Sequence, residues 1–174
     1  MNTPTVPRDF LAHAGTKLNE HLAQIVRCAG LLSTDEVWHR ANEHTNSVGN
    51  LILHLAGNVR QWILAGLGGE AVVRDRPAEF AERGPLPAAE IVAALQQVVT
   101  RAVGVLAGVD AAALEARYSV QGYDVSGVVV VFHVVEHFAF HTGQIVHMTK
   151  TLKSVDVSLY DAEGHKRPGR SVAP

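Results

Sequence analysis

Four stretches with apolar residues at helical spacing constrain the fold of this chain more than any other feature. Leucine, isoleucine, valine and alanine recur every three, four or seven positions across residues 8–32, 47–67 and 126–152. The remaining stretch begins at Pro87, a residue suited to the first turn of a helix, and extends its apolar stripe to Leu106. Four long helices in a chain of 174 residues predict an all-α fold, and specifically a four-helix bundle.

The start of the last helix contains a conflict between two sequence signals. Residues 127–132, GVVVVF, favour a strand because four of the six are β-branched valines. Apolar residues nevertheless continue at helical spacing from Val131 through Phe138 to Ile145, and intrinsic propensity is a weak guide beside such a pattern. We therefore predict one unbroken, buried helix that begins after Ser126, a suitable N-cap.

The chain is predicted to form one domain followed by a tail. Residues 68–86 are charged and interrupted by glycine and proline, which indicates a long loop between the second and third helices. A connection of this length leaves open whether the helices alternate in direction. Residues 1–152 are expected to form the bundle and residues 153–174 the tail, in which DAEG suggests a short hairpin.

Composition narrows the classes of function. A single cysteine, Cys28, rules out an internal disulfide and suits a reducing compartment, so a cytoplasmic protein is expected. The net charge of -2 and the lack of a long basic run argue against nucleic acid as a partner. No stretch approaches about 20 unbroken apolar residues, so a membrane is not an expected partner either.

Histidines of the second and fourth helices are the candidate functional residues. His137 and His141 lie four positions apart and therefore share one face of a helix. His54 lies in NLILHLAG, the most apolar part of the second helix, where a buried imidazole needs hydrogen-bond partners. His54 and the histidines of the fourth helix each belong to a line of polar residues along one helix. Either these two polar lines satisfy each other by hydrogen bonds, or three imidazoles hold a metal ion with one coordination position open. Polar residues continue each line along its helix: Asn50, Asn58 and Gln61 on the second, His133 and Gln144 on the fourth.

Two segments carry a resemblance to a known family. NSVGNLILHLAGNVRQWILAGLGG and, much later, HVVEHFAFHTGQIVHMTK resemble the DinB-like superfamily of damage-inducible helical bundles, which is distinct from the DNA polymerase of similar name. Together with RDRPAEF, the similarity spans most of residues 46–152. It implies a four-helix bundle, commonly a homodimer, with a divalent metal such as zinc or nickel. The implied ligands are His54, His137 and His141, and Thr142 stands where the family often has another histidine or a basic residue.

The resemblance also implies candidate reactions. Related bundles include S-transferases that use low-molecular-weight thiols such as bacillithiol or mycothiol. The leading hypothesis is therefore a metal-dependent transferase that acts on a small-molecule substrate with such a thiol. The alternatives are a metal-dependent hydrolase and a non-catalytic bundle that dimerises or binds a small ligand. No catalytic residue is assigned, and the candidates to orient the ligands by hydrogen bonds are Asn50, Asn58, His133 and Gln144.

Other polar residues receive simpler interpretations. His147 lies about 120° from His141 around the helix and is expected on the surface or at a dimer contact. Residues 74–80, RDRPAEF, are most simply a solvated loop, although their arginines could contact an anionic thiol if the loop covers the site. Trp62 is expected in the core or on the floor of a pocket.

Overall fold

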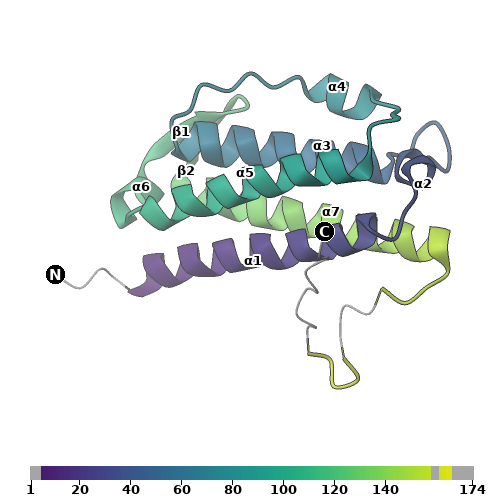
Figure 1. Cartoon of the computed structure of the whole chain (residues 1–174). Helices are drawn as coiled ribbons and strands as arrows, with labels where there is room; N and C mark the ends of the chain where they lie inside the picture. Colours follow the sequence, from purple (N-terminus) through teal and green to yellow (C-terminus); the bar gives the residue numbers. More distant parts are fainter. Residues whose placement is uncertain (1–4, 158–160, 166–174) are drawn as a thin grey trace.

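Four long helices form the body of the molecule (Figure 1). The computed structural model describes residues 5–157 and 161–165. Just after the π-helical segment η1 (Arg60–Leu67), the N–H of Gly68 donates to the carbonyl of Ile63, five residues earlier, so this part of the helix is locally wider. The long helices are α1 (Thr5–Ala29), α3 (Val48–Val59), which continues into the π-helical η1 (Arg60–Leu67), α5 (Ala88–Gly108) and α7 (Gly127–Lys153).

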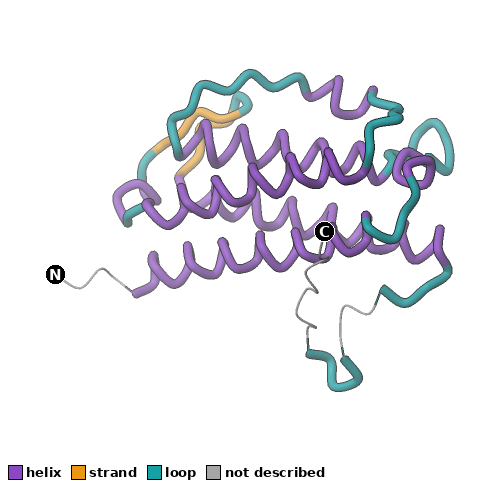
Figure 2. The backbone as a smooth tube through the Cα atoms, viewed as in Figure 1, coloured by secondary structure: helices purple, strands orange, loops and turns teal. Residues whose placement is uncertain are grey.

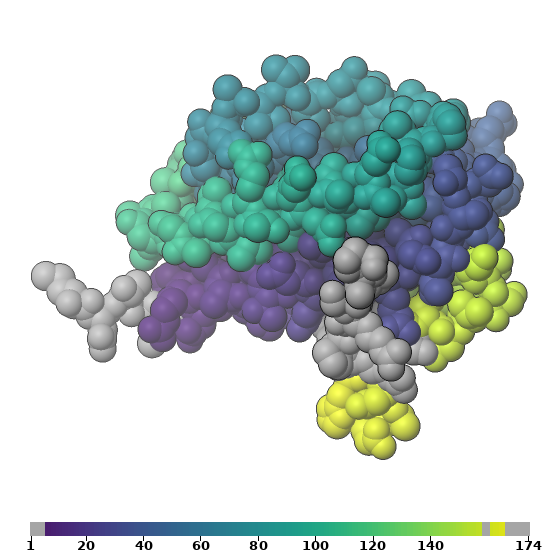
Figure 3. Space-filling view, viewed as in Figure 1, coloured from purple at the N-terminus to yellow at the C-terminus, as the bar shows by residue number. Residues whose placement is uncertain are grey.

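The long helices pack side by side through their apolar faces. Helix α1 lies against α5 and α7, and α3 with η1 lies against the same two helices. Figure 3 shows α1 and α5 in contact along one face of the molecule. The mostly helical fold agrees with the prediction from apolar spacing. Side chains with no exposed surface fill the core, among them Leu18, Ile25, Leu55, Leu95 and Phe138.

The last long helix runs unbroken through GVVVVF, as predicted. Its first residue is Gly127, and the hydroxyl of Ser126 accepts a hydrogen bond from the N–H of Val129, which confirms the predicted N-cap. Val130 and Val131 are buried in the core, together with later residues of the same face. Burial of this face outweighs the preference of valine for strands.

The prediction of an all-α chain is wrong at residues 117–126. These residues form an antiparallel hairpin of β1 (Arg117–Val120) and β2 (Tyr123–Ser126), orange in Figure 2. Gln121 and Gly122 make the turn with φ angles of 53° and 83°. Both strands do alternate polar and apolar residues, as RYSV and YDVS on either side of the turn QG, but four residues are a short pattern beside the long helical stretches, and the hairpin was not predicted.

The connection between η1 and α5 also contains structure that was not predicted. A short helix, α4 (Arg76–Ala81), begins where the Asp75 carboxylate accepts a hydrogen bond from the N–H of Ala78. Figure 1 shows this connection extending along the outside of α3, and α4 contacts α3. We call residues 68–87 the strap.

The remaining short elements lie at the ends of the long helices. They are α2 (Thr34–Trp38) and α6 (Ala111–Glu115). Helix α7 ends at Lys153, one residue beyond the predicted boundary, and residues 161–165 form a turn. This turn contains DAEG, on which the predicted hairpin of the tail rested, and the flanking residues 158–160 and 166–174 lie outside the described residues.

Two helices, α5 and α7, are long and apolar enough to cross a membrane by length and composition alone. Core helices meet the same criterion. Both helices here contribute fully buried side chains to the core, such as Leu95 and Phe138. Their hydropathy is therefore weak evidence of a membrane location.

Candidate metal centre

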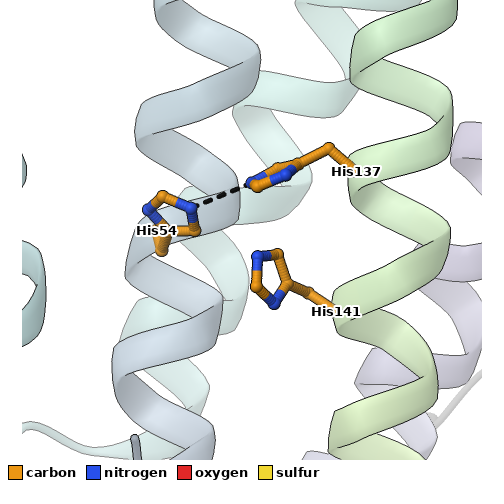
Figure 4. Close-up of side chains that lie close together, drawn as sticks. All are labelled: His54, His137 and His141. Atoms are coloured by element: carbon orange, nitrogen blue, oxygen red, sulfur yellow. Dashed lines mark hydrogen bonds between the residues drawn. The ribbon is translucent and has the colours of Figure 1, made fainter.

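Three histidines from two helices meet between α3 and α7 (Figure 4). His54 comes from the middle of α3, and His137 and His141 come from successive turns of α7. One ring nitrogen from each lies within 4.8 Å of the other two. The Nε2 atoms of His54 and His137 are 2.9 Å apart, and the ring of His141 stands perpendicular to that of His54. The i, i+4 spacing on α7 thus places two imidazoles opposite one residue of α3.

The donor atoms of this cluster suit a divalent metal ion. Imidazole nitrogen is a usual ligand of zinc, nickel and related ions. Two nitrogens at about 2.0–2.1 Å from one tetrahedral ion stand roughly 3.3 Å apart, so nitrogens within 4.8 Å converge after small side-chain rotations. His54 is 4% exposed, whereas His137 and His141 are half-buried. The cluster is therefore closed beside α3 and has access to solvent beside α7.

The imidazoles of α7 are held in their neutral form. Burial, followed by the nearby rings of His141 and His54, lowers the pKa of His137 to about 3. Burial also lowers the pKa of His141, although a hydrogen bond with Gln144 opposes the change. A metal ion binds neutral imidazole, so these two side chains need not lose a charge first.

An ion pair from the strap contacts the opposite edge of the His54 ring. Glu79 Oε2 lies 2.9 Å from Nδ1 of His54, and Arg74 donates to the two oxygens of Glu79 at 2.7 and 2.8 Å. Arg74 also donates to the side-chain oxygen of Gln61. The side chains of Arg74 and Glu79 are only 5% and 11% exposed. The interpretation of RDRPAEF as a solvated loop is therefore wrong for these two residues.

Ionisation of Glu79 follows from its partners. Burial raises the pKa of the Glu79 carboxyl, but hydrogen bonds and charge from Arg74 and His54 outweigh burial and lower it overall. The carboxylate is therefore charged at neutral pH. Its negative charge is balanced by the guanidinium of Arg74, which makes the pair tolerable in a nearly buried position.

Gly57 makes room for this ion pair on the surface of α3. A Cβ atom at position 57 would lie 1.9 Å from Oε1 of Glu79 and 2.8 Å from Nε of Arg74. Asn50 donates from its side-chain amide to the backbone carbonyls of Glu79 and Glu82, which fixes the same part of the strap. A glycine inside so apolar a helix signals the close approach of another segment, and this signal could have located the contact from the sequence.

The residues expected to orient the ligands occupy different positions around the cluster. Gln144 Oε1 lies 2.6 Å from Nδ1 of His141. Asn58 reaches His133, at 3.4 Å, rather than His54, and Asn50 contacts the strap.

His133 continues the line of histidines away from the cluster. Its ring stacks on that of His137 with centroids 5.4 Å apart and lies 4.1 Å from the ring of Trp62. Trp62 in turn donates its ring N–H to Gln121 at the tip of the hairpin. Trp62 of η1 thus links His133 to the turn of the hairpin.

A groove adjoins the cluster near the start of α3. Its volume is about 790 Å³, and it lies between residues 39–46 and the later turns of α7. Phe140 and Gln144, which both contact His141, form part of its wall. His147 also lines the groove and stays exposed, outside the three-histidine cluster. The groove has the size of a site for a small organic molecule.

Comparisons with known proteins agree with this architecture. Residues 5–161 match the model of a family described as a protein of unknown function, DUF1572. None of the curated proteins matches the chain. A DinB-like protein from Bacillus cereus ATCC 10987 is similar at 16% sequence identity and a TM-score of 0.63, over 85% of this chain and 93% of that one. A conserved protein from Enterococcus faecalis is similar at 16% identity and a TM-score of 0.62, over 89% and 99% of the two chains. At this level of identity the likeness concerns the fold.

Proposed function

We propose, from the premise that this chain belongs to the DUF1572 family and has the fold of DinB-like proteins, that it binds one divalent metal ion through His54, His137 and His141. The observation that carries the proposal is the convergence of three imidazole nitrogens within 4.8 Å between two helices. We assign the four long helices to the four-helix bundle implied by the resemblance. Zinc and nickel are the proposed ions because imidazole suits both.

The proposed activity is a metal-dependent reaction on a small molecule bound in the groove beside α7. A divalent ion held by the three histidines would lower the pKa of a thiol or a water molecule and so supply a nucleophile at neutral pH. Phe140 offers an apolar wall to the substrate, and Gln144 holds the ring of His141 at the edge of the same groove. The DinB-like resemblance favours transfer with a low-molecular-weight thiol over hydrolysis.

One contact favours a second candidate function. The Nε2 atoms of His54 and His137 are at hydrogen-bond distance, so one ring can donate to the other without any ion. Histidines that satisfy each other in this way would belong to a non-catalytic protein that binds a small ligand in the groove.

Metal content distinguishes the two candidates. Untagged protein that has been loaded with zinc or nickel and then dialysed should contain one equivalent of the metal, as measured by inductively coupled plasma mass spectrometry. Replacing His54, His137 or His141 with alanine should remove most of it, whereas His147→Ala should retain it. Wild-type protein that stays free of metal after loading would overturn the first candidate and support the second.

Reaction class is then tested with the loaded protein. The rate at which the loaded protein transfers a low-molecular-weight thiol to the electrophile monobromobimane is compared with the rate at which it hydrolyses nitrophenyl acetate. Thiol transfer that His137→Ala abolishes supports the transferase, and hydrolysis with the same dependence supports the rival reaction.

A further inference from the structure

We propose that Glu79 is a positioning residue that fixes the proton of His54 on Nδ1 and thereby keeps Nε2 of His54 free for a ligand. This role of Glu79 rests on the proposed metal site, because Nε2 of His54 is the atom that faces the other two histidines. The hydrogen bond itself does not depend on a metal.

The geometry places an acceptor on one side of the His54 ring and the cluster on the other. Nδ1 lies 2.9 Å from Glu79 Oε2, and Nε2 lies 2.9 Å from Nε2 of His137. A neutral imidazole carries one proton, on either Nδ1 or Nε2. A carboxylate accepts and cannot donate, so the contact with Glu79 requires the proton to be on Nδ1. Nε2 of His54 then carries an unprotonated lone pair that points at the cluster, where it accepts from His137 while no metal ion is bound.

A competing donor tests this assignment within the structure. Arg74 Nη2 lies 3.1 Å from Nδ1 of His54, and a bond from it would force the proton onto Nε2. The same Nη2 has a closer acceptor in Glu79 Oε2, at 2.8 Å, and Glu79 is also closer to Nδ1. Arg74 therefore orients the carboxylate, and the carboxylate orients the ring.

The carboxylate is held rigidly enough to select one tautomer. Arg74 binds its two oxygens side by side, and Gln61 takes a further donor of the same guanidinium. The strap backbone is fixed by Asn50, which donates to the carbonyl of Glu79 itself. Contacts of this kind between a ligand histidine and a carboxylate commonly change metal affinity 10–100-fold (roughly) when they are removed.

The tautomer also sets the protons inside the cluster. With Nδ1 of His54 protonated, the 2.9 Å contact between the two Nε2 atoms requires His137 to donate. Only that one proton then stands between the two nitrogens. If His54 carried its proton on Nε2 instead, the ring would have to change tautomer before it could serve as a ligand.

The test replaces Glu79 with glutamine, whose amide can donate to Nδ1 and so favours the wrong tautomer. Nitrogen–proton correlation spectra of the metal-free protein should show His54 protonated on Nδ1 in the wild type and on Nε2 in Glu79→Gln. Zinc affinity of Glu79→Gln, measured by competition with a chelator, should fall about 10–100-fold. Asp75→Asn is the matched control, since it removes a charge from the same segment while asparagine still caps α4. Its tautomer and zinc affinity should equal those of the wild type.

Each outcome decides a separate point. An unchanged His54 tautomer and zinc affinity in Glu79→Gln would overturn the positioning role. A wild type that shows the Nδ1–H tautomer, reversed in Glu79→Gln, but binds no zinc would support the hydrogen bond and contradict the metal-binding function. If Glu79→Gln does not fold, Gly57→Ala takes its place, because the added methyl displaces the carboxylate without changing it. A wild-type tautomer and affinity in that variant would equally overturn the proposal.

Discussion

At the scale of single residues, Gly57 decides how closely the strap approaches His54. Alanine is the better helix former, and in an open helix it would stabilise by about 0.5–1 kcal/mol. Its methyl would lie 1.9 Å from Glu79 Oε1, in a place where Arg74 leaves little freedom to move. We expect Gly57→Ala to destabilise the protein by about 1–3 kcal/mol, the usual cost of overpacking.

Gly104→Ala is the matched control for this substitution. Gly104 lies in α5 with nothing within 4 Å of an added Cβ, so the helix preference acts alone there. Urea denaturation should show a gain for Gly104→Ala and a loss for Gly57→Ala. A gain at both positions would show that the ion pair is not packed against α3.

The neutral histidines of α7 should make the metal-free protein sensitive to acid. Burial, then the rings of His141 and His54, lowers the pKa of His137 to about 3, below the unfolded value of about 6.5. Between these values the unfolded chain binds a proton that the folded protein does not. The contribution to stability is therefore complete above about pH 6.5 and is lost as the pH falls toward 3. The lowered pKa values of His141 and His133, caused first by burial, act in the same direction.

Urea denaturation of metal-free protein between about pH 7.5 and about pH 5 measures this effect. The urea concentration at the midpoint of unfolding should decrease as the pH is lowered, and it should decrease less steeply in His137→Asn. The lowered pKa of Glu79 stabilises the folded protein throughout this range, and that contribution is lost only below the unfolded value of about 4.5. A midpoint independent of pH would contradict the neutral assignment of His137.

Residue spacing in the sequence predicted the three histidines of the candidate site, but it did not predict the ion pair of the strap beside them. His137 and His141 could be paired from the sequence because a helix places i and i+4 on one face. His54 stood out because it interrupts an apolar run. Arg74 and Glu79 could not be assigned, because their burial depends on where a connecting segment folds back, which local spacing does not encode. In the sequence, the glycine at position 57 was the one local trace of that contact.

At the scale of elements, the N-terminal caps of α3 and α7 differ in their surroundings: the cap of α3 is buried and connected to the strap by hydrogen bonds, and the cap of α7 is not as deeply buried. Ser47 accepts from the N–H of Asn50 and is fully buried, and the Asn50 amide donates to two strap carbonyls. Ser126 caps α7 with a longer bond to Val129 and lies nearer to solvent.

Removing the two caps should therefore have unequal effects. Ser126→Ala should cost about 0.5–1 kcal/mol, as an ordinary N-cap does. Ser47→Ala should cost about 1–3 kcal/mol, because it leaves the buried N–H of Asn50 without its acceptor and removes the hydroxyl that donates to Oδ1 of Asn50. Urea denaturation of both variants tests the difference, and hydrogen exchange in residues 78–83 should accelerate only in Ser47→Ala. Equal losses would mean that the cap of α3 does not support the strap.

Long elements were predictable and short ones were not. In GVVVVF, helical spacing continued for four more turns, so burial along a whole helix outweighed strand preference. Helix α4 is stabilised by contacts with α3, which no local pattern reports. The hairpin at 117–126 contacts η1, and its alternating residues form a pattern only four residues long in each strand. Gln121 illustrates this, since its place in the turn is supported by a hydrogen bond from Trp62, 59 positions away.

At the scale of the whole molecule, α7 presents an apolar face that the described part of the chain leaves exposed. Val128, Val129, Phe132 and Phe140 are 44%, 45%, 61% and 62% exposed. Single exposed apolar residues are ordinary, but these follow one another at helical spacing along the same helix. Because the face is apolar throughout except for Glu136, a second copy can cover it in a two-fold contact without leaving buried charges other than that one.

We therefore predict a homodimer in which this face of α7 meets its copy. Light scattering coupled to size exclusion should give twice the chain mass of 18.7 kDa at micromolar concentration. Phe132→Glu should reduce the mass to that of one chain, because it replaces a large apolar contact with a second carboxylate one turn from Glu136 and so adds like charge to the same contact. Val73→Glu is the control: Val73 is fully exposed on the strap, so the same change in charge there should leave the dimer intact. A single-chain mass for the wild type would contradict the prediction, and a Phe132→Glu variant that remains dimeric would move the interface to another face.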